Sequence, residues 1–158
     1  MSYSIRPALS KDETALHALL PLLADFDVPQ GRHPDDLWLG DAKMLVKALT
    51  GVAKDSHIIV AADDNDAPVG VSMYTLKPEM LSGDLSAHLE ALAVDKNHMR
   101  QGLGKKLIDV TCEAATALGA TCMSLHVFSN NKRARALYQS CGFDEEVIRC
   151  YKPLTAGA

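Results

Sequence analysis

The stretch with the clearest potential for chemistry is Met99-Arg100-Gln101-Gly102-Leu103-Gly104-Lys105-Lys106, between a predicted strand and a predicted helix. The first N–H groups of a helix have no intrahelical partner, and together with the helix dipole they attract an anion. Gly102 and Gly104 would let a phosphate approach the backbone closely, and three basic side chains add positive charge. The stretch therefore predicts a pyrophosphate site, with a ligand-free glycine turn as the alternative.

Two other phosphate-binding motifs do not fit this stretch. A P-loop requires Ser or Thr directly after Gly-Lys, whereas Lys106 stands there. The dinucleotide fingerprint requires a third glycine and an acidic residue about 20 positions later, and neither is present. The ligand class is therefore left open by this motif alone.

Composition supports an anion site without suggesting nucleic acid. The chain has 158 residues, with 16 Lys and Arg against 20 Asp and Glu, and a net charge of −4. This balance argues against a general nucleic-acid binder. Residues 101–158 are nevertheless the basic part, with seven basic and five acidic residues, against nine and fifteen in residues 1–100. An anion in the C-terminal third and ordinary surface scatter both explain this asymmetry.

The length suits one domain, predicted over residues 1–158, and 47% of the residues are hydrophobic. No apolar run approaches a membrane span, and the first 20 residues do not resemble a secretory signal. We therefore expect a cytoplasmic protein with no membrane or nucleic-acid partner. Its four cysteines form no C-x-x-C pair, so we expect reduced thiols and no metal site.

The elements that must position this loop follow from periodicity and turn signals. A capping box at Ser10 and Glu13 predicts a helix start, and Pro21 should break that helix. Along residues 86–94, Ala87, Leu89, Ala91 and Ala93 should form one apolar row, opposite a polar row containing His88 and Glu90. The strands are predicted at residues 4–7, 57–62, 69–76, 86–94, 121–128 and 146–152, and the helices at 10–23, 41–49, 103–118 and 131–141.

The resulting order, β-α-α-β-β-β-α-β-α-β, predicts an α/β fold with a mixed sheet and helices on both faces. The unit from Ser86 to Phe128 should be a right-handed parallel crossover. The loop at residues 99–106 would then open the crossover helix.

A second motif identifies a family resemblance. Residues 125–143 have the form L-x-V-x-x-x-N-x-x-A-x-x-L-Y-x-x-x-G-F. With the glycine loop before it, this stretch resembles the GNAT superfamily of acyl-CoA-dependent N-acetyltransferases, over about residues 88–143. The resemblance implies the GNAT fold and acetyl-CoA as cosubstrate.

The resemblance also implies which residues hold the cosubstrate. The loop residues would bind its pyrophosphate through backbone amides, although Met99 stands where the family has Gln or Arg. The strand end Leu92-Ala93-Val94 would be bulged and pair with the pantetheine arm, with the Leu92 N–H as oxyanion donor. Asn131 would contact the same arm or cap the last helix. The implied cosubstrate-binding residues are Leu92, Ala93, Val94, Met99, Arg100, Gln101, Gly102, Leu103, Gly104, Lys105, Asn131, Ala134 and Tyr138.

The same resemblance assigns the acid and leaves the base open. Tyr138 matches the family's general acid, which protonates the departing thiolate. His88, Glu90 and His126 are three candidates for the base that deprotonates an amine, with a structural role as the alternative for either histidine. Glu90 or His126, acting through water, is the preferred assignment.

The acceptor should bind against residues 25–40, a region that varies within the family. Phe26 and Trp38 are the candidate contacts there, with Glu90 and His126 on the facing strands. The acidic residues of this region would suit a cationic amine, and Trp38 could instead anchor the following helix.

These residues predict transfer of an acetyl group to a primary amine of a small molecule by direct attack in a ternary complex. A protein N-terminal amine is the alternative acceptor, and a non-catalytic acyl-CoA sensor is the alternative class. Family members are often dimeric, which leaves a homodimer open.

Overall fold

The computed structural model describes residues 2–154. Its centre is one five-stranded sheet in the order β1-β2-β3-β4-β5. Neighbouring strands run antiparallel except β4 and β5, which are parallel. The strands are β1 (Ser4–Pro7), β2 (Ser56–Ala62), β3 (Pro68–Pro78), β4 (Leu85–Val94) and β5 (Met123–Leu125).

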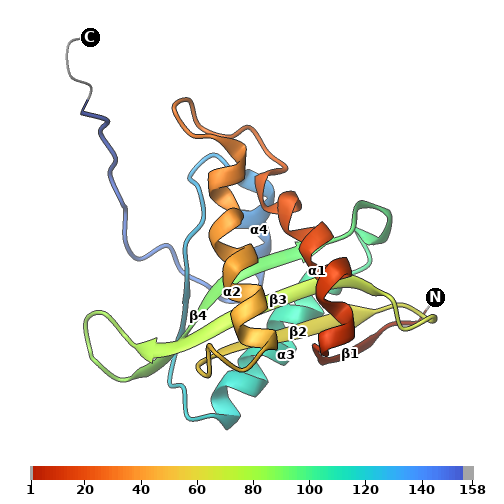
Figure 1. Ribbon diagram of the computed structural model, residues 1–158. Helices are drawn as coiled ribbons and strands as arrows, with labels where there is room; N and C mark the ends of the chain where they lie inside the picture. Colours follow the sequence, from red (N-terminus) through yellow and green to blue (C-terminus); the bar gives the residue numbers. More distant parts are fainter. Residues whose placement is uncertain (1, 155–158) are drawn as a thin grey trace.

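Four α-helices cover the two faces of the sheet (Figure 1). The first pair, α1 (Glu13–Leu19) and α2 (Leu39–Leu49), lies on one face, and α3 (Leu103–Ala117) and α4 (Lys132–Ser140) lie behind the sheet. Short 3-10 helices cover Ser10–Asp12, Leu20–Ala24, Pro34–Leu37 and Lys96–His98. The predicted mixed α/β architecture is therefore confirmed.

Two apolar clusters hold these layers together, one on each face of the sheet. Leu16 of α1 and Leu45 of α2 pack with Val60, Val71 and other residues of the central strands. Leu103 and Leu107 of α3 pack on the opposite face. Burying such side chains contributes roughly 1.5–3 kcal/mol each, which fixes the position of α3 against the sheet.

The start of the first helical region differs from the predicted capping box. The backbone N–H of Leu9 donates to Asp12 at 2.8 Å, so Asp12 makes the reciprocal contact that we predicted for Glu13. Asp12 is buried and also accepts from the Arg6 guanidinium at 2.8 Å. This ion pair ties β1 to the helical region, whose cap lies at Leu9, one residue earlier than predicted. The predicted break is confirmed, because α1 ends at Leu19, two residues before Pro21.

The faces of β4 are also corrected by the structure. Tyr74 of β3 pairs with Leu89, and the preceding Met73 pairs with Ala91, so Glu90 is an extra residue in β4. Such a bulge shifts the alternation of side chains by one position. Ala87 therefore packs on the α3 face, whereas Ala91 and Ala93 pack on the α1 and α2 face. The predicted continuous apolar row is wrong, and the bulge lies at Glu90 rather than at residues 92–94.

The far edge of the sheet is shorter than predicted. The strand predicted over residues 121–128 is reduced to β5, Met123–Leu125. The strand predicted over residues 146–152 is absent, because residues 143–154 form neither helix nor strand and residues 144–154 are exposed. β5 therefore pairs with β4 alone among residues 2–154, through Met123, Ser124 and Leu125.

Candidate functional site

β4 and β5 separate halfway along β4, and this separation opens the candidate site. The two strands pair from Ala87 to Leu89, and β4 then continues to Val94 without pairing to β5. On the β3 side, Leu92 still pairs with Ser72 and Ala93 with Val71. Residues 90–94 therefore present an unpaired backbone edge toward the gap, where an extended ligand can add like a strand.

The glycine loop lies directly after this edge. Asp95 caps the 3-10 turn Lys96–His98, and α3 then begins at Leu103 with Gly102 as its N-cap. Arg100 and Gly102 both adopt left-handed conformations, with φ of +63° and +76°. Alternating left-handed residues turn successive backbone N–H groups toward one side, which suits a phosphate. The predicted position of the loop at a helix start is therefore confirmed.

Gly104 has a different structural reason from the one predicted. A Cβ on Gly104 would lie 3.1 Å from Cδ2 of Leu137 in α4. The residue therefore allows α3 and α4 to approach each other closely. Around Gly102 a Cβ would meet nothing within 4 Å, so only its left-handed backbone requires glycine there.

Basic side chains gather near the loop and are partly neutralised. Asp25 lies 3.4 Å from Nζ of Lys96 and 3.9 Å from the Arg133 guanidinium. Arg133 also approaches Sδ of Met99 at 3.8 Å. Lys105 is turned along α3 toward Asp109, at 3.2 Å. The residues before α3 and at the start of α4 thus form a basic rim around the mouth of the gap.

Two histidines predicted as base candidates lie together across the two strands. The rings of His88 on β4 and His126 after β5 are 4.8 Å apart between centroids. Nδ1 of His88 is 2.8 Å from the Ser124 hydroxyl, which fixes the orientation of its ring. His88 is buried and His126 is exposed. Burial lowers the pKa of His88, and the charges of Lys77 and His126 lower it further. The charge of Glu90 acts in the opposite direction, but the net effect is a lowered pKa.

A carboxylate that the sequence analysis did not consider joins this group. Asp41 lies in the first turn of α2, and burial together with the charge of Glu90 raises its pKa to about 6. The charge of Glu90 acts on Asp41 from a distant part of the sequence, so no local sequence pattern indicates this effect. Perturbed carboxyl groups in a cleft are typical of functional sites.

Tyr138 lies on α4, apart from the two histidines. Its ring makes an edge contact with Phe143 at 5.9 Å between centroids. Burial and the neighbouring Cys141 raise the pKa of Tyr138 to about 12, so its phenol stays protonated at neutral pH.

Of three further predicted site residues, two lie beside the gap and one lies in the core. Asn131 caps α4, because its side chain accepts a hydrogen bond from the Ala134 N–H at 3.3 Å. Phe26 packs against Phe128 at 5.6 Å, and the Asn130 side chain donates to the backbone oxygen of Asp27, so this part of residues 25–40 borders the gap. Trp38 instead packs against the apolar cluster beneath α1 and α2 and against His17, which is the anchoring alternative.

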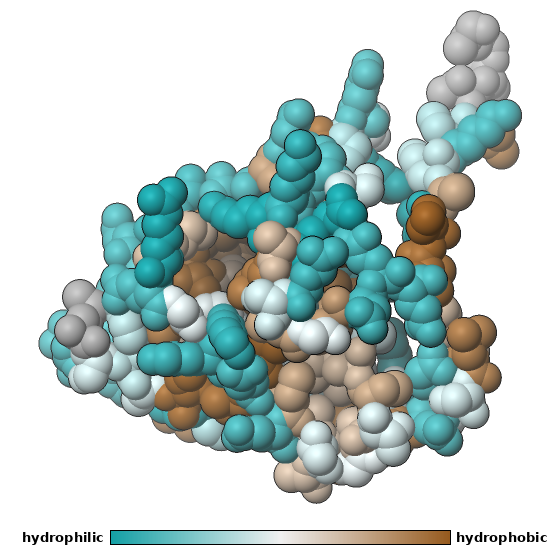
Figure 2. All heavy atoms as spheres, turned by 180° about the vertical axis from the view of Figure 1, so that it is seen from behind, coloured by the Kyte–Doolittle hydropathy of each residue, from teal (hydrophilic) through white to brown (hydrophobic). Residues whose placement is uncertain are grey.

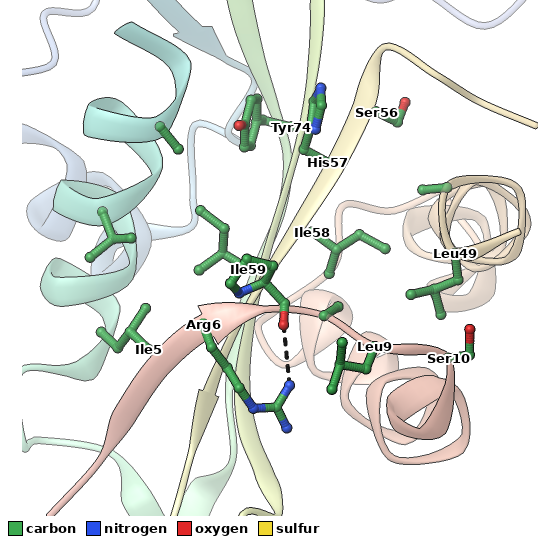
Figure 3. Close-up of a pocket in the computed structure, with 15 residues that line it drawn as sticks. Ile5, Arg6, Leu9, Ser10, Leu49, Ser56, His57, Ile58, Ile59 and Tyr74 are labelled. Carbon is green, nitrogen blue, oxygen red and sulfur yellow. Dashed lines mark hydrogen bonds between the residues drawn. The ribbon is translucent and has the colours of Figure 1, made fainter. Parts of the chain in front are cut away.

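A separate cavity of about 470 Å³ lies at the β1 edge of the sheet, beside β1, β2 and the end of α2 (Figure 3). It is lined by Arg6, Leu9, Ile58 and other side chains, but by none of the predicted site residues. His57 stacks on Tyr74 there, with ring centroids 5.1 Å apart. The Arg6 guanidinium is engaged by Asp12 and Asp66. We therefore place the candidate site at the gap beside β4.

Within residues 2–154, no three His, Cys, Asp or Glu side chains are grouped so that they could hold a metal ion. No helix of these residues combines the length and apolar character that crossing a bilayer requires.

Comparison with known proteins identifies the family of this chain. Residues 16–143 match the acetyltransferase (GNAT) family model. A 72-residue stretch, 45% of the chain, is 40% identical to the [ribosomal protein bS18]-alanine N-acetyltransferase of Escherichia coli strain K12. The match covers 49% of that relative, so the chain spans about half the length of this curated protein.

Solved structures share the fold over the whole chain. AAC(6')-Iy, in complex with the bisubstrate analogue CoA-S-monomethyl-acetylneamine, superposes with a TM-score of 0.74 at 21% identity, covering 98% of this chain and 100% of its own. The aminoglycoside 6'-N-acetyltransferase AAC(6')-Ih from Acinetobacter baumannii gives 0.74 at 19% identity, covering 99% and 100%. On the family match and this shared fold, the chain is a member of the acetyltransferase (GNAT) family.

Proposed function

We propose that residues 1–158 act as one acetyltransferase domain that transfers an acetyl group from acetyl-CoA to a primary amine of a small molecule. The observation that carries this proposal is the unpaired β4 edge at residues 90–94, directly before the helix start at Gly102. An extended arm can pair with the edge while a pyrophosphate meets the helix N-terminus. This pair of sites matches two adjoining parts of a CoA molecule, the pantetheine arm and the pyrophosphate.

The chain would hold the cosubstrate with backbone groups and a basic rim. The N–H groups of residues 101–104 would face the pyrophosphate, with Arg100 and Lys105 at the rim. Leu92, Ala93 and Val94 would pair with the pantetheine arm, and the Leu92 N–H would stabilise the oxyanion that forms on the thioester carbonyl. The side-chain oxygen of Asn131 already accepts a hydrogen bond from the Ala134 N–H. Asn131 would therefore contact the pantetheine arm through its other polar atoms.

The acceptor must lose a proton before it attacks, and three groups support this step. His88, Glu90 and His126 lie close together at the gap, and the lowered pKa keeps His88 neutral at pH 7. A neutral imidazole can accept a proton, directly or through water. The exposed His126 would pass that proton to solvent. Ser124 would act as a positioning residue, because its hydroxyl orients His88.

Tyr138 would donate to the departing sulfur. A thiol has a pKa near 8.5, whereas that of Tyr138 is about 12, so full transfer to a free thiolate is unfavourable. The phenol would therefore act by hydrogen bonding as negative charge develops on sulfur, with proton transfer accompanying C–S cleavage. The amine nitrogen would first bond to the carbonyl carbon and form the oxyanion, which would then collapse and break the carbon–sulfur bond. The acetyl group would pass directly to the amine, and no cysteine of the chain would carry it.

The acceptor class is proposed from the charges at the gap. Asp41 and Glu90 face each other there, and a cation between them would relieve their repulsion. Phe26 borders the same region and would contact the acceptor. A protein N-terminal amine is the second candidate, because a 72-residue stretch of this chain is 40% identical to the bS18-alanine N-acetyltransferase.

Incubating the purified protein with acetyl-CoA and a mixed amine panel tests the proposal. The panel contains polyamines, free amino acids, an aminoglycoside and short peptides with free N-termini. Mass spectrometry then reads acetylated products and acetyl-CoA bound to the native protein. We expect bound acetyl-CoA and an acetylated small amine.

The other outcomes separate the alternatives. Acetylation of the peptides alone would replace the small-molecule proposal with the N-terminal one. Binding of acetyl-CoA without any product would favour an acyl-CoA sensor. The absence of both binding and product would contradict the site itself.

A further inference from the structure

Tyr3 lies directly before β1, and its side chain reaches the glycine loop that precedes α3. Its hydroxyl donates a hydrogen bond to Oε1 of Gln101 at 2.7 Å and lies 3.0 Å from Nδ1 of His98. A phenol has one hydrogen, which goes to Gln101 here, so Nδ1 of His98 donates to the phenol oxygen. One hydroxyl therefore binds two residues that stand 95 and 98 positions later in the sequence.

These two contacts flank a residue with a strained backbone. His98 ends the 3-10 turn before the loop, and Gln101 directly follows Arg100. Between them, Arg100 has a φ of +63°, in a left-handed region that residues with a side chain rarely adopt. Such a conformation persists only where the surrounding structure holds it in place. The hydroxyl of Tyr3 supplies contacts of this kind on both sides of Arg100.

The ring of Tyr3 is itself held in position by the sheet and the core. The next residue, Ser4, pairs with Ala62 of β2. The ring packs on the apolar cluster of the α3 face, which includes Leu103, and makes an edge contact with His98 at 5.8 Å between centroids. Because the ring is held by this packing, its hydroxyl can act as a fixed support for the loop.

The supported loop leads into a hydrophilic surface at the start of α3. Figure 2 views the molecule from the face that α3 covers and shows hydrophilic side chains around the start of this helix. The exposed residues there include Arg100, Gln101, Lys105 and Lys106. A phosphate binds more tightly to N–H groups that already stand in place, because binding then requires no further ordering of the backbone.

We propose that Tyr3 is a positioning residue for the cosubstrate site, because its hydroxyl holds His98 and Gln101 and so keeps the loop preformed for a pyrophosphate. This inference rests on the proposed function, which assigns acetyl-CoA to the loop. Tyr3 acts through the loop and not on the reacting atoms. Its loss should therefore change the binding of acetyl-CoA and leave the transfer step unchanged.

The first test removes the hydroxyl and keeps the ring. In Tyr3→Phe, calorimetry should show acetyl-CoA binding that is roughly fivefold weaker, as expected for the loss of one or two hydrogen bonds. The KM for acetyl-CoA should rise by the same factor, with kcat unchanged. Tyr74→Phe is the matched control, because Tyr74 packs in the same cluster but pairs with His57 and Leu89 in the middle of the sheet. It should leave the affinity unchanged.

The second test asks whether Tyr3 acts through its partner in the loop. Gln101→Met removes the acceptor oxygen while keeping a side chain of similar length. Together with Tyr3→Phe and the double variant, it completes a double-mutant cycle for acetyl-CoA binding. Because both changes break the same hydrogen bond, the double variant should bind acetyl-CoA about as weakly as Tyr3→Phe alone.

The third test separates positioning of the loop from general stability. Hydrogen exchange of the ligand-free protein reports how often each segment opens. In Tyr3→Phe, peptides covering residues 96–104 should exchange faster than in the wild type. Peptides covering β2 and β3 should exchange at the wild-type rate, because the strand pairing is unaltered.

Each outcome decides for or against this role of Tyr3. Weaker binding of acetyl-CoA, with faster exchange confined to the loop, supports it. Equal affinity in Tyr3→Phe and the wild type would overturn it, as would additive losses in the cycle or faster exchange throughout the sheet. A wild type that does not bind acetyl-CoA would contradict the proposed function as well, and this result is distinguishable because it requires no variant.

Discussion

The phenol of Tyr138 provides the sharpest prediction at the scale of single residues. Tyr138→Phe keeps the ring contact with Phe143 but removes the hydroxyl, so kcat should fall roughly 100-fold while the KM for acetyl-CoA stays unchanged. Since the pKa of Tyr138 is about 12, its titration should cause no loss of wild-type rate below pH 10. Steady-state kinetics across pH measures both the loss of kcat in the variant and the pH dependence of the wild-type rate. Tyr151→Phe is the matched control, and equal losses in the two variants would remove Tyr138 from the mechanism.

Asp41 links stability to function at the same scale. Its pKa is raised to about 6 in the folded protein, so the folded state holds its proton more tightly than the unfolded state. This favourable contribution is present below the unfolded pKa near 3.9 and is lost as pH rises through about 6. Asp41→Asn should therefore stabilise the protein at pH 7.5, by about 1 kcal/mol after screening by solvent.

The same variant should bind a cationic acceptor less well. We expect its KM to rise roughly tenfold, a difference of about 1.4 kcal/mol. Urea unfolding at pH 5 and pH 7.5 measures the stability, and acceptor titration measures KM. Asp84→Asn, at an exposed carboxylate in the turn between β3 and β4, should change neither the stability nor the KM. Destabilisation of Asp41→Asn at pH 7.5 would show that this carboxyl is a structural group.

At the scale of elements, the helix start at Gly102 carries the anion site. Gly102→Ala would place an L side chain at φ +76°, at a cost of roughly 1–2 kcal/mol, and shift the N–H groups that follow. Acetyl-CoA affinity should fall about tenfold by calorimetry. Gly51→Ala has the same φ of +76° and the same open surroundings, so it should lose stability without losing affinity. Equal affinity in both variants would contradict the loop assignment.

Local signals predicted the elements well where the cause lay within a few residues. Asn131 was expected as a possible cap for the last helix, and it caps α4. The bulge at Glu90 could not be predicted, because the alternating pattern of residues 86–94 continues through it. Its cause is the pairing with β3, and therefore the faces of β4 were assigned wrongly beyond that point.

The candidate site was predictable only in part for the same reason. The two motifs placed the loop and α4, and they placed His88 and His126 on strands that do become neighbours. Asp41 is linked to the site by the charge of Glu90, which lies far from it in the sequence, and this relation has no local signature. Conversely, residues 146–152 have the composition of a strand, but a strand forms only where a neighbouring strand pairs with it.

At the scale of the whole molecule, the place where acetyl-CoA binds is the most direct test of the proposed cosubstrate site. Hydrogen exchange of the wild-type protein should slow, on adding acetyl-CoA, in peptides covering residues 90–94 and residues 99–106 together. These are the unpaired edge of β4 and the loop at the start of α3. Peptides lining the cavity beside β1, such as residues 5–10 and 56–59, should be unchanged. Protection confined to that cavity, or no protection at either segment, would contradict the placement of the site.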